Sequence, residues 1–576
     1  MTDAQQQRWA TWGIAALLML HVGLAFDAAR QWAPTHDEYW HLPVGLLNLR
    51  TGRFDYDRLN PPGMRMLAAI PVWLAGGESG IVDSNEQTTV YGNQFFAANG
   101  ERSRQLFLLG RCMVILTSVC GGVILSKWCW ELSGPLAAVV GVAFWCADPT
   151  MIANAALVTT DMGAVVFMLS TLYSLWHFAQ RPTFVNALVF GMLLGISQLI
   201  KFTCLLLFPL AFLLWFVARW RNPAVKESSA KKITVLWILA LSLSLFCLNA
   251  GYLFQGTFSE IELLEFGSDS MRAVSVFCGG SVRAPVPIDY LLGLDHQRAM
   301  MEITHPVFLN EVWQTDPFPQ YYLMTLVYKL PHVTQFLVVL TAIAFVIPGT
   351  WSRFLRQSLF LVFPAAVLVI VASCSRMQLG IRYILPALPL LFVWSAGLVS
   401  SLAVSHKRAK LALMAATCLM LVPLRFHPHH LGYFNLFAGG PGEGRLHLVD
   451  SNIDWGQDLY FLKLYVDEHH IEDLGLAYFG SISPAKAGLS YHIPPLYNPE
   501  PGWYAVSVNF VMGRPYVVRG EDGESLTAAP YALSYFRKFK EQARVGSSIY
   551  VYHLTEADVE HFRKTVRIKA IPYPEL

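Results

Sequence analysis

Long apolar segments constrain this chain more than any other feature of its sequence. Eleven stretches qualify as candidate membrane spans, since a helix that crosses a bilayer needs about 20 mostly apolar residues and shorter helices are tolerated inside a bundle. These stretches are 10–27, 105–125, 134–152, 162–179, 186–200, 203–218, 233–253, 332–350, 358–374, 383–404 and 410–424. The pattern predicts a mainly α-helical, polytopic integral membrane protein.

Composition excludes a soluble globular protein. Hydrophobic residues make up 54% of the chain and charged residues 14%, whereas soluble proteins carry about 25% charged residues. The net charge is only +2 and there is no basic tract, which excludes nucleic acid as a partner. The nine cysteines lie almost entirely in apolar stretches, and their spacing predicts neither a metal site nor a disulfide framework.

The short loops predict the orientation, because cytoplasmic loops of membrane proteins are enriched in Lys and Arg. With the N-terminus inside, the cytoplasmic loops carry eleven basic residues against two acidic ones, Glu131 and Glu227. These loops are 126–133, 180–185, 219–232, 351–357 and 405–409. The long loops 28–104 and 254–331 then face outside, as does the tail of the chain.

The apolar runs stop after residue 424, which predicts a transmembrane domain, 1–424, and an extracytoplasmic domain, 425–576. A tail of about 150 residues is large enough for a core of its own. Strand-like runs alternate in it with helix-like ones, which predicts a small α/β domain. The strand-like runs are 474–481, 503–512 and 548–554, and the helix-like runs are 458–470 and 531–542. In the first loop, the short apolar stretch 64–75 is predicted to be an interfacial helix.

The most informative polar segment follows the first candidate span. Thr35 and Glu38 have the spacing of a capping box, which would put Asp37 and Glu38 in the first turn of a helix at the outer surface. Asp37 and His41 then share one face of that helix. Both carboxylates could simply stabilise the helix terminus, and for Glu38 this alternative is as good as a functional role. For Asp37 we favour function, because a charge at the membrane boundary needs a wet cavity with partners.

Further charged residues lie at the outer ends of candidate spans. Asp161 could cap the helix that follows it or could belong to a functional site. The two roles are equally favoured and are compatible with each other. Lys201 lies between two short spans, where burial without a partner would cost about 2.5–3.5 kcal/mol; its partner is either a carboxylate or a bound phosphate. Arg382 poses the same question, and its guanidinium suits bidentate contact with phosphate. Lys329 is predicted to be an interfacial lysine whose ammonium group reaches water.

Together these segments resemble the GT-C class of glycosyltransferases. Asp37-Glu38 with His41, followed by TGRF and NPP, is similar to the first outer loop of that class. The most similar branch comprises the dolichyl-phosphate-mannose–protein mannosyltransferases and the aminoarabinose transferases. Four later segments follow in the order and on the membrane side of the pattern: TTD at 159–161, KFT at 201–203, YYLMTLVYKLP at 321–331 and RYILPALP at 382–389. The resemblance covers roughly residues 10–425.

The resemblance implies an inverting transfer of a sugar from a polyprenyl-phosphate carrier to an acceptor protein, lipid or glycan at the extracytoplasmic face. Asp37 would be the general base, because an ionised carboxylate can take the proton of the attacking hydroxyl. Glu38 and Asp161 would complete the catalytic group by orienting this base or the acceptor.

The resemblance also assigns roles to cations. Lys201, Arg382 and His41 would hold the carrier phosphate and stabilise the charge that grows on it as it leaves. No cofactor is required; some relatives use a metal at comparable carboxylates, so a divalent metal stays open, although no His/Asp spacing here predicts a metal site. The segments 427–435 and 450–459 look like bacterial members of the group. This implies the bacterial inner (plasma) membrane, with a cytoplasmic N-terminus and a periplasmic tail.

A loop in the tail resembles a calcium site only in part. It begins with D-x-N-x-D at Asp450, but Phe461 stands where an EF-hand has its bidentate Glu. We therefore expect this loop to roof the cavity or to touch the acceptor; a plain turn into a helix at 458–469 is an equal alternative. The residues concerned are Asn452, Asp454, Trp455 and Gln457.

Two rival functions fit the same partners. A transporter or flippase of lipid-linked sugars would tend to have internal repeats and ionisable residues at the membrane midplane. This chain has no repeat, and its ionisable residues gather on one membrane face, which favours an enzyme. An inactive scaffold of the same fold is the second alternative.

Overall fold

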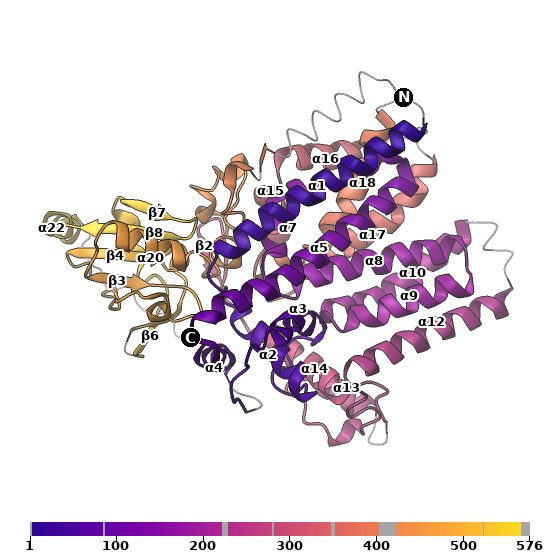
Figure 1. Ribbon diagram of the computed structural model, residues 1–576, viewed down its shortest axis with the longest axis horizontal. Coiled ribbons are helices and arrows are strands. Elements are labelled where there is room, and N and C mark those ends of the chain that lie inside the picture. The colour runs from indigo at the N-terminus through magenta and orange to yellow at the C-terminus, as the bar shows by residue number, and fades with distance from the viewer. Residues whose placement is uncertain are drawn as a thin grey trace.

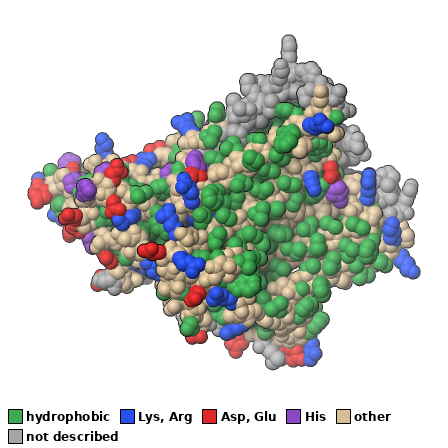
Figure 2. All heavy atoms as spheres, viewed as in Figure 1, with side chains coloured by type: hydrophobic (Ala, Val, Ile, Leu, Met, Phe, Trp, Pro, Cys, Tyr) green, Lys and Arg blue, Asp and Glu red, His purple; other side chains and the backbone are tan. Residues whose placement is uncertain are grey.

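The helices of the chain form a large bundle, and a smaller part rich in strands lies at one end of it (Figure 1). The structure is a computed structural model that describes residues 3–83, 87–221, 229–278, 282–346, 352–402, 421–422, 424–521 and 523–565. Hydrophobic side chains cover much of the visible surface of the bundle, whereas charged side chains are frequent over the strand-rich part (Figure 2). This division of the surface fits a membrane-embedded bundle with a polar region beyond it.

Ten of the eleven candidate spans contain a helix, and the eleventh, 410–424, falls almost wholly outside the described residues. The helices are α1 (Asp3–Gln31), α5 (Ser103–Ser133), α6 (Pro135–Ala147) followed by α7 (Pro149–Ala155), α8 (Asp161–Gln180), α9 (Phe184–Gln198), α10 (Leu207–Arg221), α12 (Ala230–Gly251), α16 (His332–Val346), α17 (Ser352–Ser373) and α18 (Ala387–Leu402). Among the described residues, five helical segments are long and apolar enough to cross a membrane alone, and the pair α6–α7, bent by 68°, makes a sixth. The number of spans therefore stays a prediction.

Helices α9 and α12 pack backbone to backbone because two glycines of α9 face α12. A Cβ atom at Gly191 would lie 2.4 Å from the carbonyl oxygen of Ala240. A Cβ atom at Gly195 would lie 2.4 Å from the carbonyl oxygen of Ser244. Small residues one turn apart let membrane helices approach closely and gain dispersion contacts. The tight pair fixes the outer end of α9, from which the link carrying Lys201 emerges.

The first outer loop folds into α2 (Glu38–Thr51), α3 (Gly63–Leu74) and α4 (Thr88–Asn99), and α3 packs against α5. The predicted helix at 64–75 is confirmed. Helix α2 approaches α3 so closely that a Cβ atom at Gly45 would lie 2.2 Å from the carbonyl oxygen of Arg65. The buried Arg65 Nη1 lies 2.6 Å from Asp57 Oδ2 in the turn between the two helices. These contacts hold α2, and with it Asp37, against the bundle.

The second outer loop contributes short elements, as predicted. They are α13 (Asp269–Cys278), α14 (Ile288–Glu302), the antiparallel strands β1 (Val307–Leu309) and β2 (Val312–Gln314), and α15 (Tyr321–Lys329). Two short 3₁₀ turns lie at the outer ends of bundle helices: η2 (Phe202–Leu206) before α10 and η4 (Ile381–Tyr383) before α18. Lys201 immediately precedes η2, and Arg382 lies within η4.

The tail contains a four-stranded mixed sheet in the order β3-β4-β8-β7, in which only β3 and β4 run parallel. The strands are β3 (Leu474–Ala477), β4 (Gly502–Ser507), β7 (Ala543–Val545) and β8 (Ile549–Leu554). The other elements are α20 (Leu459–Glu468), α21 (Val508–Val511), the hairpin β5 (Tyr516–Arg519) and β6 (Ser525–Ala528), and α22 (Glu556–Thr565). The helix at 458–470 is confirmed, and each predicted strand run contains a strand, but the second half of 503–512 is wrong because α21 forms there. A separate domain from residue 425 stays a prediction.

The predicted helix at 531–542 is wrong. Only the 3₁₀ turn η9 (Ser534–Lys538) forms there. Tyr531 has a φ of 65° and Phe539 is extended, so neither end can continue a helix. The ring of Phe536 instead packs on the sheet, with centroids 5.3 Å from Tyr504 and 4.9 Å from Tyr552. Packing of these rings on the sheet therefore outweighs the local helical pattern.

Candidate active site

An ion pair between the first outer loop and the segment before α18 forms the centre of the candidate site. Arg382 Nη1 lies 2.5 Å from Asp37 Oδ2, although the two residues are 345 positions apart in the chain. Their side chains keep 15% and 16% of their surface exposed. The pair is thus largely shielded from bulk solvent but still accessible to a ligand.

The tail holds Arg382 in place through the backbone of η4. Gly380 has a φ of 103°, and a Cβ atom on it would lie 2.7 Å from Asn452 Oδ1. The same oxygen accepts a hydrogen bond of 3.1 Å from the backbone nitrogen of Ile381. A side chain at position 380 would therefore strain the backbone and push the Asn452 loop away from Arg382.

A second ion pair joins two bundle segments. Lys201 Nζ lies 2.5 Å from Asp161 Oδ1, and the Asp161 side chain is 2% exposed. A carboxylate is therefore the partner of Lys201 in this structure, which was one of its two predicted alternatives. The capping interpretation of Asp161 is wrong: Thr160 occupies the cap position without a side-chain hydrogen bond, and the Asp161 carboxylate bonds Lys201 instead.

Tyr383 connects the two ion pairs. Its ring centroid lies 5.1 Å from Lys201 Nζ and 5.5 Å from Arg382 Cζ, distances at which a cation is attracted to an aromatic face. The structure thus brings two predicted carboxylates and two predicted cations from four separate segments around one tyrosine. These four residues are Asp37, Asp161, Lys201 and Arg382.

Asp37 lies in an environment that keeps it ionised. Burial pushes the pKa of Asp37 upward, but the charge of Arg382 outweighs burial and leaves this pKa below its usual range. Burial lowers the pKa of His36 to about 4, so its imidazole is neutral at physiological pH. His36 Nδ1 lies 2.6 Å from Ser481 Oγ of the tail. A charged carboxylate therefore stands beside a neutral ring.

His41 lies one turn after Asp37 on the same face of α2, as the spacing predicted. Its backbone nitrogen donates a hydrogen bond of 3.1 Å to the carbonyl oxygen of Asp37. The residue is 3% exposed, and its Nδ1 is buried without a hydrogen-bond partner among the described residues. His41 therefore lies behind Asp37 rather than on the open side of the site, which favours a role in orienting Asp37.

Glu38 bonds Thr35, but the predicted capping box does not form, because α2 begins at Glu38 with Asp37 in the cap position. Its Oε2 accepts hydrogen bonds of 2.9 Å from both the backbone nitrogen and the hydroxyl of Thr35. Its Oε1 accepts from the backbone nitrogen of Val158 at 2.8 Å, and Arg111 binds both oxygens at 2.8 and 2.7 Å. The Glu38 side chain has no exposed surface. This geometry favours the structural alternative: Glu38 holds the start of α2 against α5.

Trp455 is the residue of the tail loop that covers the site. Its ring centroid lies 4.4 Å from Arg382 Cζ. Its carbonyl oxygen accepts a hydrogen bond of 2.8 Å from the backbone nitrogen of His36. Gln457 supports it, because the side-chain oxygen of Gln457 accepts a 2.8 Å hydrogen bond from the Trp455 backbone nitrogen. Trp455 thus packs on Arg382 with Gln457 buried behind it, while a roof over a substrate cavity stays a prediction.

Asn452 and Asp454 are also buried and shape this loop from within. Asp454 accepts hydrogen bonds from the Ser507 hydroxyl and, at 2.9 Å, from the Gly456 backbone nitrogen. Burial raises the pKa of Asp454 to about 7. With 1% of their surface exposed, Asn452 and Asp454 do not face an acceptor, so the geometry favours a supporting role for both.

Sequence reasoning missed a cation from the tail. Arg514 forms an ion pair with Asp450, and its Cζ lies 4.9 Å from the ring centroid of Phe479. Burial and, more weakly, the charge of Arg382 lower the pKa of Arg514 to about 10, which places a second guanidinium near the first. No local pattern marks Arg514, because its importance arises only when the tail folds against the bundle.

Lys329 is not the interfacial lysine predicted from the sequence. It is 1% exposed, and its Nζ donates hydrogen bonds of 2.9 Å to the Leu431 carbonyl and 2.7 Å to the Asn452 carbonyl. The loop at 431–452 closes over its ammonium group, and burial lowers the pKa of Lys329 to about 7. Lys329 therefore anchors the same Asn452 that positions η4.

Within the described ranges, no group of three or more His, Cys, Asp or Glu side chains is arranged to hold a metal ion. Asp37 and Asp161 each have a cationic side chain as their partner instead.

The fold and the site define a class: a membrane protein with many apolar helices and a carboxylate–guanidinium centre at the ends of the bundle helices that meet the tail. Residues 103–249 match the family model of the dolichyl-phosphate-mannose–protein mannosyltransferases. This match confirms the predicted resemblance to the polyprenyl-phosphate-dependent glycosyltransferases of the GT-C class. No curated protein matches the chain by sequence.

Three solved structures resemble this chain over most of its length at low sequence identity. ArnT from Cupriavidus metallidurans bound to undecaprenyl phosphate is 12% identical, with a TM-score of 0.48, over 95% of this chain and 98% of ArnT. Apo ArnT is 14% identical, with a TM-score of 0.46, over 70% of this chain and 62% of ArnT. The apo oligosaccharyltransferase from Archaeoglobus fulgidus is 11% identical, with a TM-score of 0.49, over 90% of this chain and 74% of that protein.

Proposed function

We propose that the protein is an inverting glycosyltransferase that moves a sugar from a polyprenyl-phosphate carrier to an acceptor hydroxyl or amine. The observation that carries the proposal is the Asp37–Arg382 ion pair, 2.5 Å long and largely shielded, with the Lys201–Asp161 pair close by around Tyr383. The family match supports the same reaction class. The acceptor is a protein, lipid or glycan.

The proposed reaction needs a base for the acceptor group and positive charge for the leaving phosphate. Because Arg382 bonds Asp37 directly in this structure, the pair must separate when the donor sugar binds. Asp37 takes the proton of the acceptor group while the acceptor atom bonds to the anomeric carbon. The bond between that carbon and the carrier phosphate breaks, and its electron pair leaves with the phosphate. Arg382 and Lys201 stabilise the resulting phosphate monoester. Arg382 suits this task because its buried Nε has no partner among the described residues.

The proposed reaction occurs at the extracytoplasmic face of the inner membrane. The basic residues of the short loops support a cytoplasmic N-terminus, and the candidate site lies at the opposite ends of the bundle helices. The tail, which supplies Trp455 and Arg514, would then lie in the periplasm. Accessibility of a cysteine placed at an exposed tail position, such as Glu472→Cys, to an impermeant thiol reagent tests this orientation in intact spheroplasts, with a chain lacking its native cysteines as background.

The test of function uses purified protein in proteoliposomes with a radiolabelled polyprenyl-phosphate sugar. An enzyme releases polyprenyl phosphate, a flippase moves unchanged label across the bilayer, and an inactive scaffold does neither. We expect the wild type to release polyprenyl phosphate and Asp37→Asn to lose about 10²–10⁴-fold in rate, the range of general-base catalysis. Asp55→Asn is the matched control, because Asp55 lies in the same loop and pairs with the exposed Arg53. Wild-type turnover by Asp37→Asn would remove the base assignment.

A further inference from the structure

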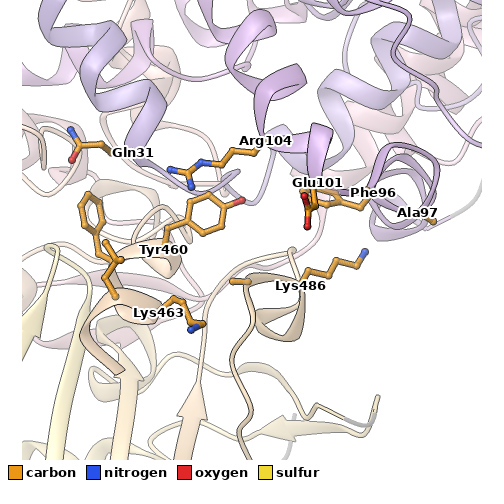
Figure 3. A pocket seen from close by; sticks show the side chains of 12 residues that line it. Gln31, Phe96, Ala97, Glu101, Arg104, Tyr460, Lys463 and Lys486 are labelled. Atoms are coloured by element: carbon orange, nitrogen blue, oxygen red, sulfur yellow. The ribbon is translucent and has the colours of Figure 1, made fainter. Parts of the chain in front are cut away.

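A cavity lies away from the candidate active site, where the bundle meets the tail. It has a volume of about 680 Å³ and lies between α1, α4 and α5 on one side and α20 with the turn η8 (Pro484–Ala487) on the other. This volume falls within the range of about 300–1,000 Å³ typical of ligand pockets. Figure 3 shows Arg104 and Gln31 entering from the helical side and Tyr460 and Lys486 from the tail. Asp37, Asp161, Lys201 and Arg382 are not part of its lining.

Two cations in this cavity are bonded to neutral groups only. Arg104 Nη2 donates a hydrogen bond of 3.0 Å to the Arg30 carbonyl, and Arg104 Cζ lies 4.6 Å from the ring centroid of Tyr460. Lys486 Nζ lies 3.2 Å from the Tyr39 hydroxyl and 3.1 Å from Asn93 Oδ1. Neither cation has an ion pair among the described residues.

The remaining charges of the lining leave an excess of positive charge. Lys463 is neutralised by Asp467, its partner one turn later on α20. Glu101 is the one acidic side chain among the residues that line the cavity. It forms no ion pair with Arg104 or Lys486 within the described part of the chain. Arg104 and Lys486 are exposed in this open cavity. Two cations without an ion pair attract an anion, and a guanidinium on an aromatic ring suits a phosphate group.

A second, smaller cavity extends the first along the bundle. It has a volume of about 240 Å³, lies between α1 and α5, and shares Arg104 with the large cavity. Phe107 and Leu108 give it apolar walls, and Arg30, which also lines it, is neutralised by Asp27. Beyond it, Phe26 of α1 and Leu116 of α5 are 41% and 52% exposed. An apolar chain that leaves the phosphate position can therefore continue along the lipid-facing surface of α1 and α5.

The surface of the molecule supports a position at the membrane boundary. Figure 2 shows basic side chains where the hydrophobic surface of the bundle meets the mixed polar surface of the tail. Arg104 is the second residue of α5, so it stands at the outer end of a helix long and apolar enough to span. Basic side chains in this position attract anionic headgroups.

We propose that this cavity binds the phosphate group of an anionic membrane lipid, held between Arg104 and Lys486. The rest of the headgroup lies against Tyr460 and Phe96, and the acyl chains run past Phe107 along α1 and α5. The site is separate from the sugar-transfer site, so lipid binding here does not depend on the proposed function. A bound lipid would join the bundle to the tail, because Arg104 belongs to α5 of the bundle and Lys486 to η8 of the tail.

The test measures lipid retention on the full-length purified protein by native mass spectrometry. The probes are dioleoylphosphatidylglycerol, dioleoylphosphatidylcholine and, for the free anion, inorganic phosphate. We expect the phosphatidylglycerol to bind more tightly than the phosphatidylcholine. Replacing both cations, by Arg104→Gln with Lys486→Gln, should weaken phosphatidylglycerol binding by about 30-fold, the effect of two basic residues at a lipid surface. Arg102→Gln, which removes an exposed charge outside the cavity lining, should leave binding unchanged.

Three results would overturn the proposal. Equal retention of both lipids by the wild type removes headgroup selectivity. An equal loss in Arg102→Gln shows that general surface charge, rather than the cavity, attracts the lipid. Displacement of phosphatidylglycerol by excess inorganic phosphate, together with tight phosphate binding, identifies a free-anion site instead of a lipid site. The single variant Arg104→Lys keeps the charge and provides a folded protein if the double variant is unstable; it should retain most of the affinity.

Discussion

Replacing Arg382 by Gln should shift the pH dependence of the reaction in a direction fixed by the structure. In the wild type, burial pushes the pKa of Asp37 up and Arg382, 2.5 Å away, more than offsets it. An opposite charge at such a distance lowers a carboxyl pKa by about 1–3 pH units. Without Arg382 the effect of burial remains, so the pKa of Asp37 rises. A base must be ionised, and therefore activity should be lost on acidification at a higher pH than in the wild type.

The assay is a pH profile of kcat/KM for release of polyprenyl phosphate. We expect the acidic limb of the Arg382→Gln profile to move up by about 1–3 pH units. The maximal rate should also fall by about 10- to 150-fold, because a charge-assisted hydrogen bond to the donor phosphate, worth about 1.5–3 kcal/mol, is lost. Arg382→Lys keeps the charge and should leave the acidic limb near its wild-type position. Arg376→Gln removes an exposed guanidinium that bonds only the Glu302 carbonyl and serves as the second control. An unshifted acidic limb in Arg382→Gln would refute the reasoning.

Three further predictions concern the residues that hold the site. Glu38→Gln leaves the buried Arg111 without its charged partner and should lower the free energy of unfolding by about 3–5 kcal/mol; thermal unfolding with no change in Tm would contradict this. Gly380→Ala adds a Cβ 2.7 Å from Asn452 at a φ of 103° and should raise KM for the donor about tenfold by displacing Arg382, whereas an unchanged KM argues against the positioning role. Lys329→Met removes the hydrogen bonds to Leu431 and Asn452 and should cost about 1.5–3 kcal/mol of stability. Because burial lowers the pKa of Lys329 to about 7 from 10.5, the unfolded state binds more protons between these values, and wild-type stability relative to Lys329→Met should rise with pH across that window.

Local chemistry made part of this site predictable. The T-x-x-E spacing correctly predicted a contact between Thr35 and Glu38, since the two residues lie within one turn of each other. It placed the helix start wrongly, because α2 begins at Glu38 with Asp37 as its cap residue. The cost of burying Lys201 correctly predicted an anionic neighbour. The sequence could not say which anion, because Asp161 lies 40 positions away and several carboxylates precede it. Candidate spans were predictable for the same reason: apolar runs mark them without knowledge of their neighbours.

Properties that arise from contacts between distant segments could not be predicted. Lys329 has the sequence context of an interfacial lysine, and only the folded loop at 431–452 encloses its ammonium group. Arg514 stands in a mostly apolar stretch of the tail, and its charge acts near Arg382 only once the tail has folded. The segment 531–542 has helical periodicity, but the ring of Phe536 gains more from the sheet than a short helix could supply.

The separation of Asp37 from Arg382 in the chain has a consequence for biosynthesis. Ribosomes add about 5–20 residues per second, so roughly 20–70 s pass between the synthesis of Asp37 and that of a partner 345 residues later. Throughout that interval the nascent polypeptide holds only half of the centre, and no truncated product that ends before η4 can complete it. The proposed centre can therefore assemble only after synthesis has passed η4, close to the last described helix of the bundle, α18.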